Sequence, residues 1–390
     1  MFFSKWFPWN LCLKNEKPTI MDMPHLVMTQ ILDNVGFLDM LNLRKTCKTF
    51  RNFIDDVKPN NDLKKVNIRL GHKLLTVDLV LETNGIYESF FVTYQIGPKD
   101  NCYLVYKNEP EFAEKRDGHF LEAFLNDFEP ILKNQRSKLT DLEIKINSFA
   151  FWLTYSYPPL SKFQSIFSRF LCSDYKERER FCEMAHEINN HLHLETANEM
   201  IARLEQILKS RTVPLNVENL DLTVFKSSQI FGILRFIKAN SFKAFQANFD
   251  FCNEEDPQVL DLIQKCQTLK SLEYLEIQDF SIKNSISDFL DIPELSIWRH
   301  SSLREDTLIL KQAFLTNHHL KKWELKYQTS KDYNILYEVL GDIPYNPPAN
   351  WFFRIPNSEE VLSISVSFGF GSISFTRIIL DDVSGNELIL

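Results

Sequence analysis

Glycine is scarce in this sequence, with 10 in 390 residues. Glycine-rich loops cradle phosphate groups and shape the turn that carries a nucleophilic serine, and none of the patterns GxxxxGK, GxGxxG or GxSxG occurs here. The sequence therefore gives no support for a nucleotide-binding or serine-hydrolase site, and we predict no catalytic residues and no enzyme activity.

Paired metal ligands are also missing. No two of the seven cysteines form a CxxC pair, and their number is odd, which argues against both a disulfide framework and a zinc site. His186 and His191 are five apart, whereas two histidines that share a helix face and one ion are four apart. We expect no metal, no cofactor and a reducing compartment, the cytoplasm or the nucleus.

The chain lacks a basic block and a long apolar run. Its formal net charge is -8, and nucleic-acid binders usually carry a basic patch, so we predict no nucleic-acid partner. Lys5 and Pro8 interrupt the aromatic start, and nothing approaches the roughly 20 apolar residues of a membrane span. We expect residues 1–20 to be a leader that folds back on the body, with contact to a membrane surface or a partner as the alternative, and no membrane insertion.

What the chain does contain is apolar side chains, 44% of all residues, enough for a large core in two or three domains. Residues 21–56 have the three- and four-residue apolar spacing of helices. The period changes to two over 63–106, which predicts a small antiparallel sheet. Residues 109–138 and 156–212 favour helices, and beyond 216 strand-like and helical runs alternate.

A short pattern, apolar-x-x-apolar-x-apolar, recurs along the second half. Its copies are Leu139/Leu142/Ile144, Val217/Leu220/Leu222, Phe242/Phe245/Ala247, Leu272/Leu275/Ile277, Ile292/Leu295/Ile297, Leu320/Trp323/Leu325 and Val361/Ile364/Val366. Most of the steps between copies suit leucine-rich repeats, and helical stretches such as 227–239 and 304–314 fill the gaps. We predict an α+β chain that ends in an irregular leucine-rich-repeat-like α/β solenoid, with a compact α+β domain as the alternative.

Residues Met23 to Phe50 read MPHLVMTQILDNVGFLDMLNLRKTCKTF. This stretch resembles the F-box, whose usual form LPxELLxxILSYLxxxDLLxLRxVCKxW aligns with it without a gap. In two places the chain departs from the family pattern. Leu26 stands where the family has an acidic residue, and Gly36-Phe37 replaces an Asp-Pro pair.

The resemblance implies a module of three short helices that binds a Skp-type adaptor and, through it, a cullin. Three short helices cannot hide all their apolar faces from water, and an exposed apolar face usually marks a partner site. The alternative is that these helices only cap the following sheet. The residues expected to bind the adaptor are Met23, Pro24, Val27, Ile31, Leu32, Leu41, Leu43 and Phe50.

The runs LKSLEYLEIQDF from Leu269 and WFFRIPNSEEVLSISV from Trp351 extend the resemblance. They are similar to the FTH domain of the nematode F-box A proteins, which implies a target-binding C-terminal half. The predicted division is a leader at 1–20, the F-box at 21–60, an antiparallel β segment at 61–108, a mainly helical region at 109–215 and an FTH-like repeat domain at 216–380.

These observations predict a substrate-recognition adaptor of a Skp–cullin–F-box ubiquitin ligase, which holds a protein target of unknown identity. The alternatives are an interaction scaffold without a role in ubiquitin ligation and an enzyme whose site is assembled from distant residues. Target recognition is expected on outward positions of the repeat strands, where alternation places side chains on one surface. These positions are Tyr274, Glu276, Gln278, Lys322, Glu324 and Lys326.

Overall fold

The computed structural model consists of two compact units, divided after residue 61. The residues it describes are 20–32, 34–57, 63–71, 73–83, 85–97, 101–106, 113–146, 194–246, 272–282, 285–299, 303–327, 334–341, 349–367 and 371–383. The leader and the histidine pair at 186 and 191 lie outside these ranges, so the expectations for them stay predictions.

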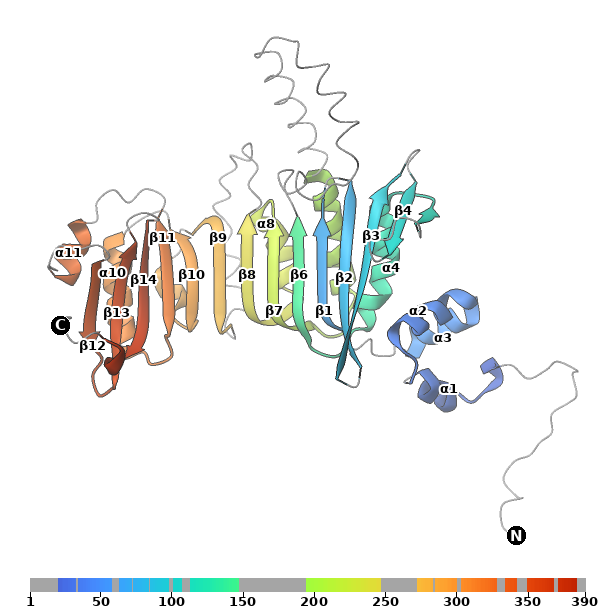
Figure 1. Ribbon diagram of the computed structural model, residues 1–390, viewed down its shortest axis with the longest axis horizontal. Coiled ribbons are helices and arrows are strands. Elements are labelled where there is room, and N and C mark those ends of the chain that lie inside the picture. The colour runs from blue at the N-terminus through green and yellow to red at the C-terminus, as the bar shows by residue number, and fades with distance from the viewer. Residues whose placement is uncertain are drawn as a thin grey trace, which may run out of the picture. The chain divides into compact units, whose positions relative to one another are not determined.

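The first unit contains a short 3-10 helix, η1 (Ile20–Asp22), and the helices α1 (His25–Leu32), α2 (Phe37–Thr46) and α3 (Lys48–Val57) (Figure 1). Its core is built from one residue of each helix, Leu32, Met40 and Ile54. Val35, Leu43 and Phe53 pack around these three side chains. Some of the apolar residues with helical spacing therefore form an internal core, and only the others are available to a partner.

The second unit is built on one mixed sheet, whose strands stand upright beside one another in Figure 1. Its strands are β1 (Leu63–Leu70), β2 (Leu74–Thr83), β3 (Ile86–Ile96), β4 (Cys102–Tyr106), β5 (Glu114–Arg116), β6 (Leu139–Ile146), β7 (Leu215–Val224), β8 (Ile237–Gln246), β9 (Tyr274–Ile282), β10 (Glu294–Arg299), β11 (Lys322–Tyr327), β12 (Ala349–Arg354), β13 (Glu360–Ser367) and β14 (Ser372–Ile379). Their order across the sheet is β12-β13-β14-β11-β10-β9-β8-β7-β6-β1-β2-β3-β4-β5.

The middle of the sheet is parallel and both ends are antiparallel. β1, β6, β7, β8, β9, β10 and β11 run parallel, each bonded to the next. β2 to β5 continue the sheet antiparallel at one end, and β14, β13 and β12 do so at the other. Parallel neighbours need a crossover connection, and helices make several of these connections.

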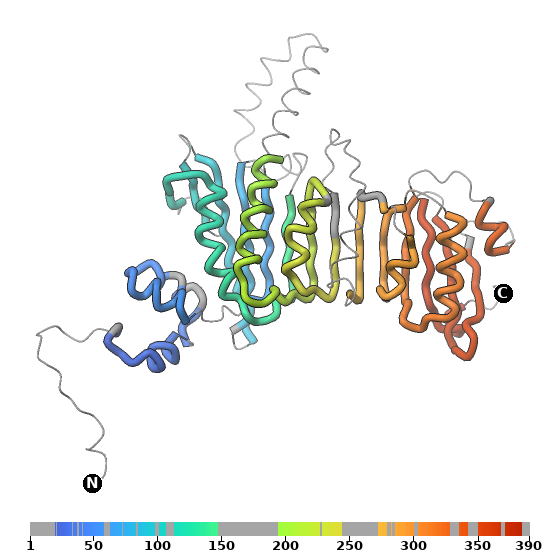
Figure 2. The backbone as a smooth tube through the Cα atoms, turned by 180° about the vertical axis from the view of Figure 1, so that it is seen from behind, coloured from blue at the N-terminus to red at the C-terminus, as the bar shows by residue number. Residues whose placement is uncertain are grey.

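The helices of this unit lie on one face of the sheet, as Figure 2 shows from behind. They are α4 (Phe120–Asn134), a helix over residues 194–209, α8 (Ser227–Leu234), α10 (Leu303–Thr316) and α11 (Asn334–Leu340). Alternate strand residues point toward them, so Leu220 and Leu222 are buried while Asn219 and Asp221 stand on the opposite face. We call that opposite side the open face, because no helix of the described ranges covers it.

The structure corrects the expected sheet at 63–106. Its antiparallel pairing is present, but these strands do not form a sheet of their own, because β1 bonds to β6 in parallel register. Alternation along a strand shows which face is buried and carries no information about which distant strand pairs with it.

Three further expectations on local structure need correction. The stretch 109–138 contains β5 as well as α4, and the helix expected at 227–239 ends at Leu234 because β8 begins at Ile237. The third repeat copy is shifted along its strand: Phe242 lies opposite Leu220, so it takes the second apolar position of the repeat and not the first. Ala239 takes the first position, opposite Val217.

Candidate functional site

The start of α1 exposes apolar side chains. Met23 is 45% exposed, Leu26 69% and Val27 40%. Pro24 precedes the helix, where its missing N–H costs nothing, and its carbonyl accepts hydrogen bonds from the N–H groups of Val27 and Met28 at 2.9 and 3.1 Å. The first turn is thereby fixed, and we call Met23, Leu26 and Val27 the α1 patch.

The eight residues expected to bind an adaptor fall into different environments. Met23, Pro24 and Val27 are exposed, and Ile31 and Phe50 are half-buried. Leu32 is only 1% exposed and belongs to the core, against which Leu43 packs. Leu32 therefore presents no surface to a partner in this conformation. The side chain of Leu41 lies outside the described part of the chain.

Leu26 is a residue that sequence reasoning left out. It was noted only as a departure from the family pattern, yet it is the most exposed side chain of the α1 patch. The signal was its position beside Val27, one residue from a predicted contact. A leucine that replaces an acidic residue on an exposed turn is itself a sign of an apolar surface.

Polar and aromatic contacts fix the angle between these helices. The Arg44 guanidinium donates two hydrogen bonds to the Asp55 carboxylate, at 2.8 and 3.0 Å, and so joins α2 to α3. The rings of His25 and Phe53 lie 5.0 Å apart and join α1 to α3. The α1 patch thus stands on a module with defined internal contacts.

The second candidate surface is the open face of the sheet. The strand register places Tyr274, Glu294 and Lys322 in one row across β9, β10 and β11, and Glu276, Ser296 and Glu324 in the next. The structure therefore brings the six residues expected to bind a target onto one face. Their role in target binding remains a prediction.

Charged side chains near the middle of this face are paired with one another. Lys65 lies 2.7 Å from Asp141, Arg69 lies 3.0 Å from Glu143, and Lys243 lies 3.6 Å from Glu276. The amide of Asn219 donates to Asp141 at 3.0 Å, and Ser241 donates to Asn219 at 2.7 Å. These groups already use much of their capacity for polar contacts.

The pKa values reflect that pairing. Burial of Glu143 alone would raise the pKa of its carboxyl group, but hydrogen bonds from Lys145 and Arg69 outweigh burial and lower it. The pKa of Lys145 is raised, because its bonds and attraction to Glu143 and Asp221 exceed the cost of its burial. Burial raises the pKa of Asp221 in spite of Lys145.

Tyr274 and Glu276 form a similar group on β9. The Tyr274 hydroxyl donates to Glu276 at 2.7 Å, and the Gln278 amide donates to the other carboxylate oxygen. Burial first and Glu276 second raise the pKa of Tyr274. Burial alone would raise the pKa of Glu276, but these hydrogen bonds and the charge of Lys243 lower it.

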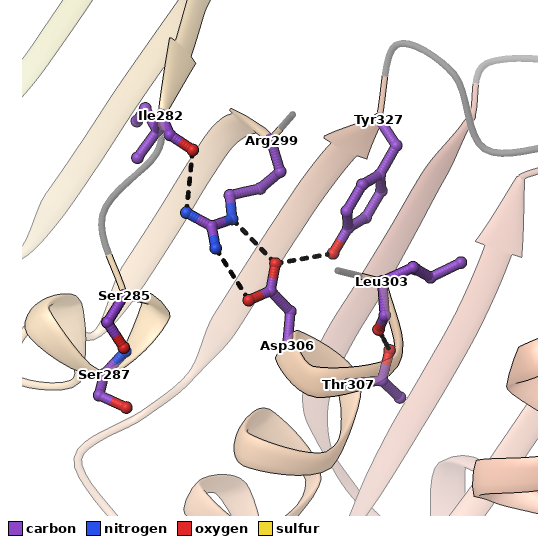
Figure 3. A network of polar contacts seen from close by, with 8 residues as sticks. All are labelled: Ile282, Ser285, Ser287, Arg299, Leu303, Asp306, Thr307 and Tyr327. Carbon is purple, nitrogen blue, oxygen red and sulfur yellow. Dashed lines mark hydrogen bonds and ion pairs between the residues drawn. The ribbon is translucent and has the colours of Figure 1, made fainter. Parts of the chain in front are cut away.

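A buried polar network joins three strand ends to a helix (Figure 3). Arg299 donates to both carboxylate oxygens of Asp306 at 2.8 and 2.9 Å, and to the carbonyl oxygen of Ile282 at 3.0 Å. The Tyr327 hydroxyl donates to Asp306 at 3.2 Å. These groups are buried and mutually satisfied, which is the arrangement of a structural clamp.

In the described ranges, no group of three or more His, Cys, Asp or Glu side chains could hold a metal ion. The helices found in those same ranges include none long and apolar enough to cross a membrane.

Comparison with known families identifies two regions of the chain. The family model of the F-box domain matches residues 20–62, and that of the FTH domain matches residues 198–340. Both resemblances seen in the sequence are confirmed. The FTH match overlaps the expected range 216–380 but starts before residue 216 and stops at residue 340. No curated protein and no solved structure is significantly similar to the chain.

The chain thus carries an F-box domain and an FTH domain, which are typical of non-enzymatic substrate-recognition adaptors. The F-box supports a role in Skp–cullin–F-box ubiquitin ligation and implies binding to Skp1 and, through it, to a cullin.

Proposed function

We propose that this chain is the substrate receptor of a Skp–cullin–F-box ubiquitin ligase. The helices α1, α2 and α3 form the F-box and dock on the adaptor, and the sheet unit holds a protein target. The observation that carries the proposal is the F-box match at 20–62 together with the exposed α1 patch inside it.

The α1 patch suits a docking role because its side chains are apolar, large and held on one rigid turn. Apolar anchors at the centre of an interface often contribute about 2 kcal/mol or more each. Leu32 and Leu43 serve indirectly, since they keep the helices together underneath. Ile31 and Phe50 are half-buried and would lie at the margin of the contact.

The sheet unit supports the second half of the proposal. The parallel strands β6 to β11 lie side by side in the order in which they follow one another in the chain, an order also found in leucine-rich-repeat-like solenoids. Such arrays offer an extended surface, because every second residue of each strand points to the same face of the sheet. The receptor performs no bond chemistry, because it acts by raising the local concentration of its target near the ligase.

The test is binding of the purified full chain to a Skp-type adaptor, followed by capture of a cullin. Leu26→Asp/Val27→Asp places two charges in the α1 patch, and Gln206→Asp/Gln312→Asp makes the same charge change at exposed polar positions on helices of the sheet unit. We expect the first variant to lose binding while it stays folded by circular dichroism, and the second to bind like the unmodified chain.

A folded, unmodified chain that does not bind the adaptor would contradict the proposal. The chain would then be better described as a scaffold without a role in ubiquitin ligation. Leu32→Asp is unsuitable for this test, because it would put a charge into the core and unfold the module.

A further inference from the structure

Near one end of the open face, the neighbouring strands β13 and β14 carry six hydroxyl side chains. Ser363 lies opposite Thr376, Ser365 opposite Ser374, and Ser367 opposite Ser372. We call these six residues the hydroxyl ladder. The residues between them, such as Ile364 and Phe375, are fully buried on the helix-covered face, so the pleat of the strands directs the hydroxyl groups to the open face. Five of the six residues are partly exposed there, and Ser372 is buried.

The hydroxyl groups of the ladder are not used inside the chain. None of the six makes a side-chain hydrogen bond within the part that the structure describes. Elsewhere on the open face the corresponding groups are engaged, as Ser89 is with Asp78 at 3.0 Å and Ser241 with Asn219 at 2.7 Å. The five partly exposed residues of the ladder therefore have free capacity to donate and accept hydrogen bonds.

Lysines stand directly beside the ladder. β11 pairs with β14 so that Lys322 lies opposite Thr376, Glu324 opposite Ser374 and Lys326 opposite Ser372. Among described residues, no ion pair forms on Lys322, Glu324 or Lys326. A partner can engage these charges without first breaking a bond inside the sheet, in contrast to the paired lysines 145 and 243.

Charge is unevenly distributed along the open face. The two register rows that contain Lys322 and Glu324 cross strands β6 to β10 at five carboxylates and one lysine. These residues are Asp141, Glu143, Asp221, Glu276, Glu294 and Lys243. On the described residues from β11 onward, the face carries Lys322, Lys326 and the exposed Arg354, and Glu324 is the carboxylate among them. This end is basic on a chain whose formal net charge is -8.

From this arrangement we infer that the surface formed by Lys322, Lys326 and the hydroxyl ladder binds an extended acidic segment, a stretch rich in Asp or Glu, of the target protein. The inference rests on the proposed function, since it assigns part of the sheet unit to target capture. Ammonium and hydroxyl donors side by side suit carboxylate groups, because charge-assisted hydrogen bonds are the stronger kind. A serine side chain can form hydrogen bonds to a ligand at a small cost in conformational entropy, because it is short.

The inference is tested with a fluorescent peptide of alternating glutamate and glycine residues, its lysine counterpart, and the purified full chain. We expect the glutamate peptide to bind, the lysine peptide not to bind, and added salt to weaken the complex. Lys322→Glu/Lys326→Glu should reduce affinity about tenfold or more, since tenfold corresponds to the loss of one good contact. Lys115→Glu/Lys209→Glu makes the same charge change at exposed sites elsewhere and should leave affinity unchanged.

A second variant examines the hydroxyl groups without altering charge. Ser365→Ala/Ser374→Ala removes one facing pair of hydroxyl groups from the ladder. It should lower the affinity for the glutamate peptide a few-fold and leave folding unchanged. The inference is overturned if the unmodified, folded chain ignores the glutamate peptide, prefers the lysine peptide, or is unaffected by Lys322→Glu/Lys326→Glu. Adaptor binding, measured in the same samples, decides the proposed function separately from this surface.

Discussion

Arg299 and Asp306 form a two-point ion pair in the interior of the sheet unit, with side chains only 4% and 3% exposed. Arg299 ends β10 and Asp306 lies in the first turn of α10, so the pair fixes the helix to the strand that precedes it. The Tyr327 hydroxyl and the Ile282 carbonyl complete the hydrogen bonds. Both charges are therefore compensated at short range in a region of low dielectric constant.

Removal of one partner of this pair should be severe. Asp306→Ala leaves the Arg299 charge buried without its partner, and we expect the free energy of unfolding to fall by about 3–5 kcal/mol. Urea denaturation measures this change, with the exposed Asp288→Ala on η6 as the control. An Arg299→Met/Asp306→Leu variant should be less destabilised than Asp306→Ala. The clamp interpretation is wrong if Asp306→Ala unfolds at the urea concentration of the control.

Tyr327 makes the free energy of unfolding depend on pH in the alkaline range. Burial first, and the neighbouring Asp306 carboxylate second, hold the pKa of Tyr327 well above its ordinary value. Above pH ~10 the unfolded chain releases this proton while the folded chain keeps it, so stability present at lower pH is lost as pH rises.

Tyr327→Phe should therefore flatten the loss of stability above pH ~10, measured by urea denaturation at a series of pH values. Tyr87→Phe is the control, because the Tyr87 side chain is 64% exposed. Equal slopes for the two variants would show that Tyr327 ionises as freely in the folded chain as in the unfolded one.

Arg211 caps the C-terminal end of α4, a helix far from it in the sequence. Its guanidinium donates to the backbone carbonyls of Leu132, Lys133 and Gln135 at the end of α4. Arg211→Ala leaves these carbonyl groups without their charged donor and should cost about 1.5–3 kcal/mol in urea denaturation. Arg203→Ala, exposed on the helix over 194–209, should cost far less. Similar losses from both arginines would rule out a specific cap.

Leu32 and Leu26 should separate stability from adaptor binding. Leu32→Ala opens a cavity in the core of the first unit and should cost about 2–5 kcal/mol, seen as a lower thermal transition of its helices. Leu26→Ala should barely move that transition, because its side chain is already in water. If the two variants melt alike, the burial of Leu32 does not stabilise the module.

Periodicity predicted the strands of the sheet unit well and their pairing poorly. The spacing of Leu142 and Ile144 matches that of Leu220 and Leu222, and these residues do lie opposite one another. On β8 the same pattern was placed to start at Phe242 where the register starts it at Ala239, because alanine is a weak apolar signal and phenylalanine a strong one. Only the register to the neighbouring strand resolves that ambiguity.

The two candidate surfaces differ in how well the sequence predicts which side chains are exposed. Alternation correctly placed Tyr274 and Lys322 on one face, since a strand has only two faces. On α1 the apolar stripe contained both core and surface residues, and spacing alone cannot tell Leu32 from Val27. That distinction depends on where Met40 and Ile54 pack, which is a long-range property of three helices.

The agreement between chain order and sheet order from β6 to β11 has a consequence for how such a chain can change over generations. Duplication or loss of one strand with its connecting segment would lengthen or shorten the array while every other pairing kept its register. The antiparallel strands at both ends would still terminate it. Recognition could then be altered by the number and order of strands as well as by point substitution, and the helices of the first unit would be left untouched.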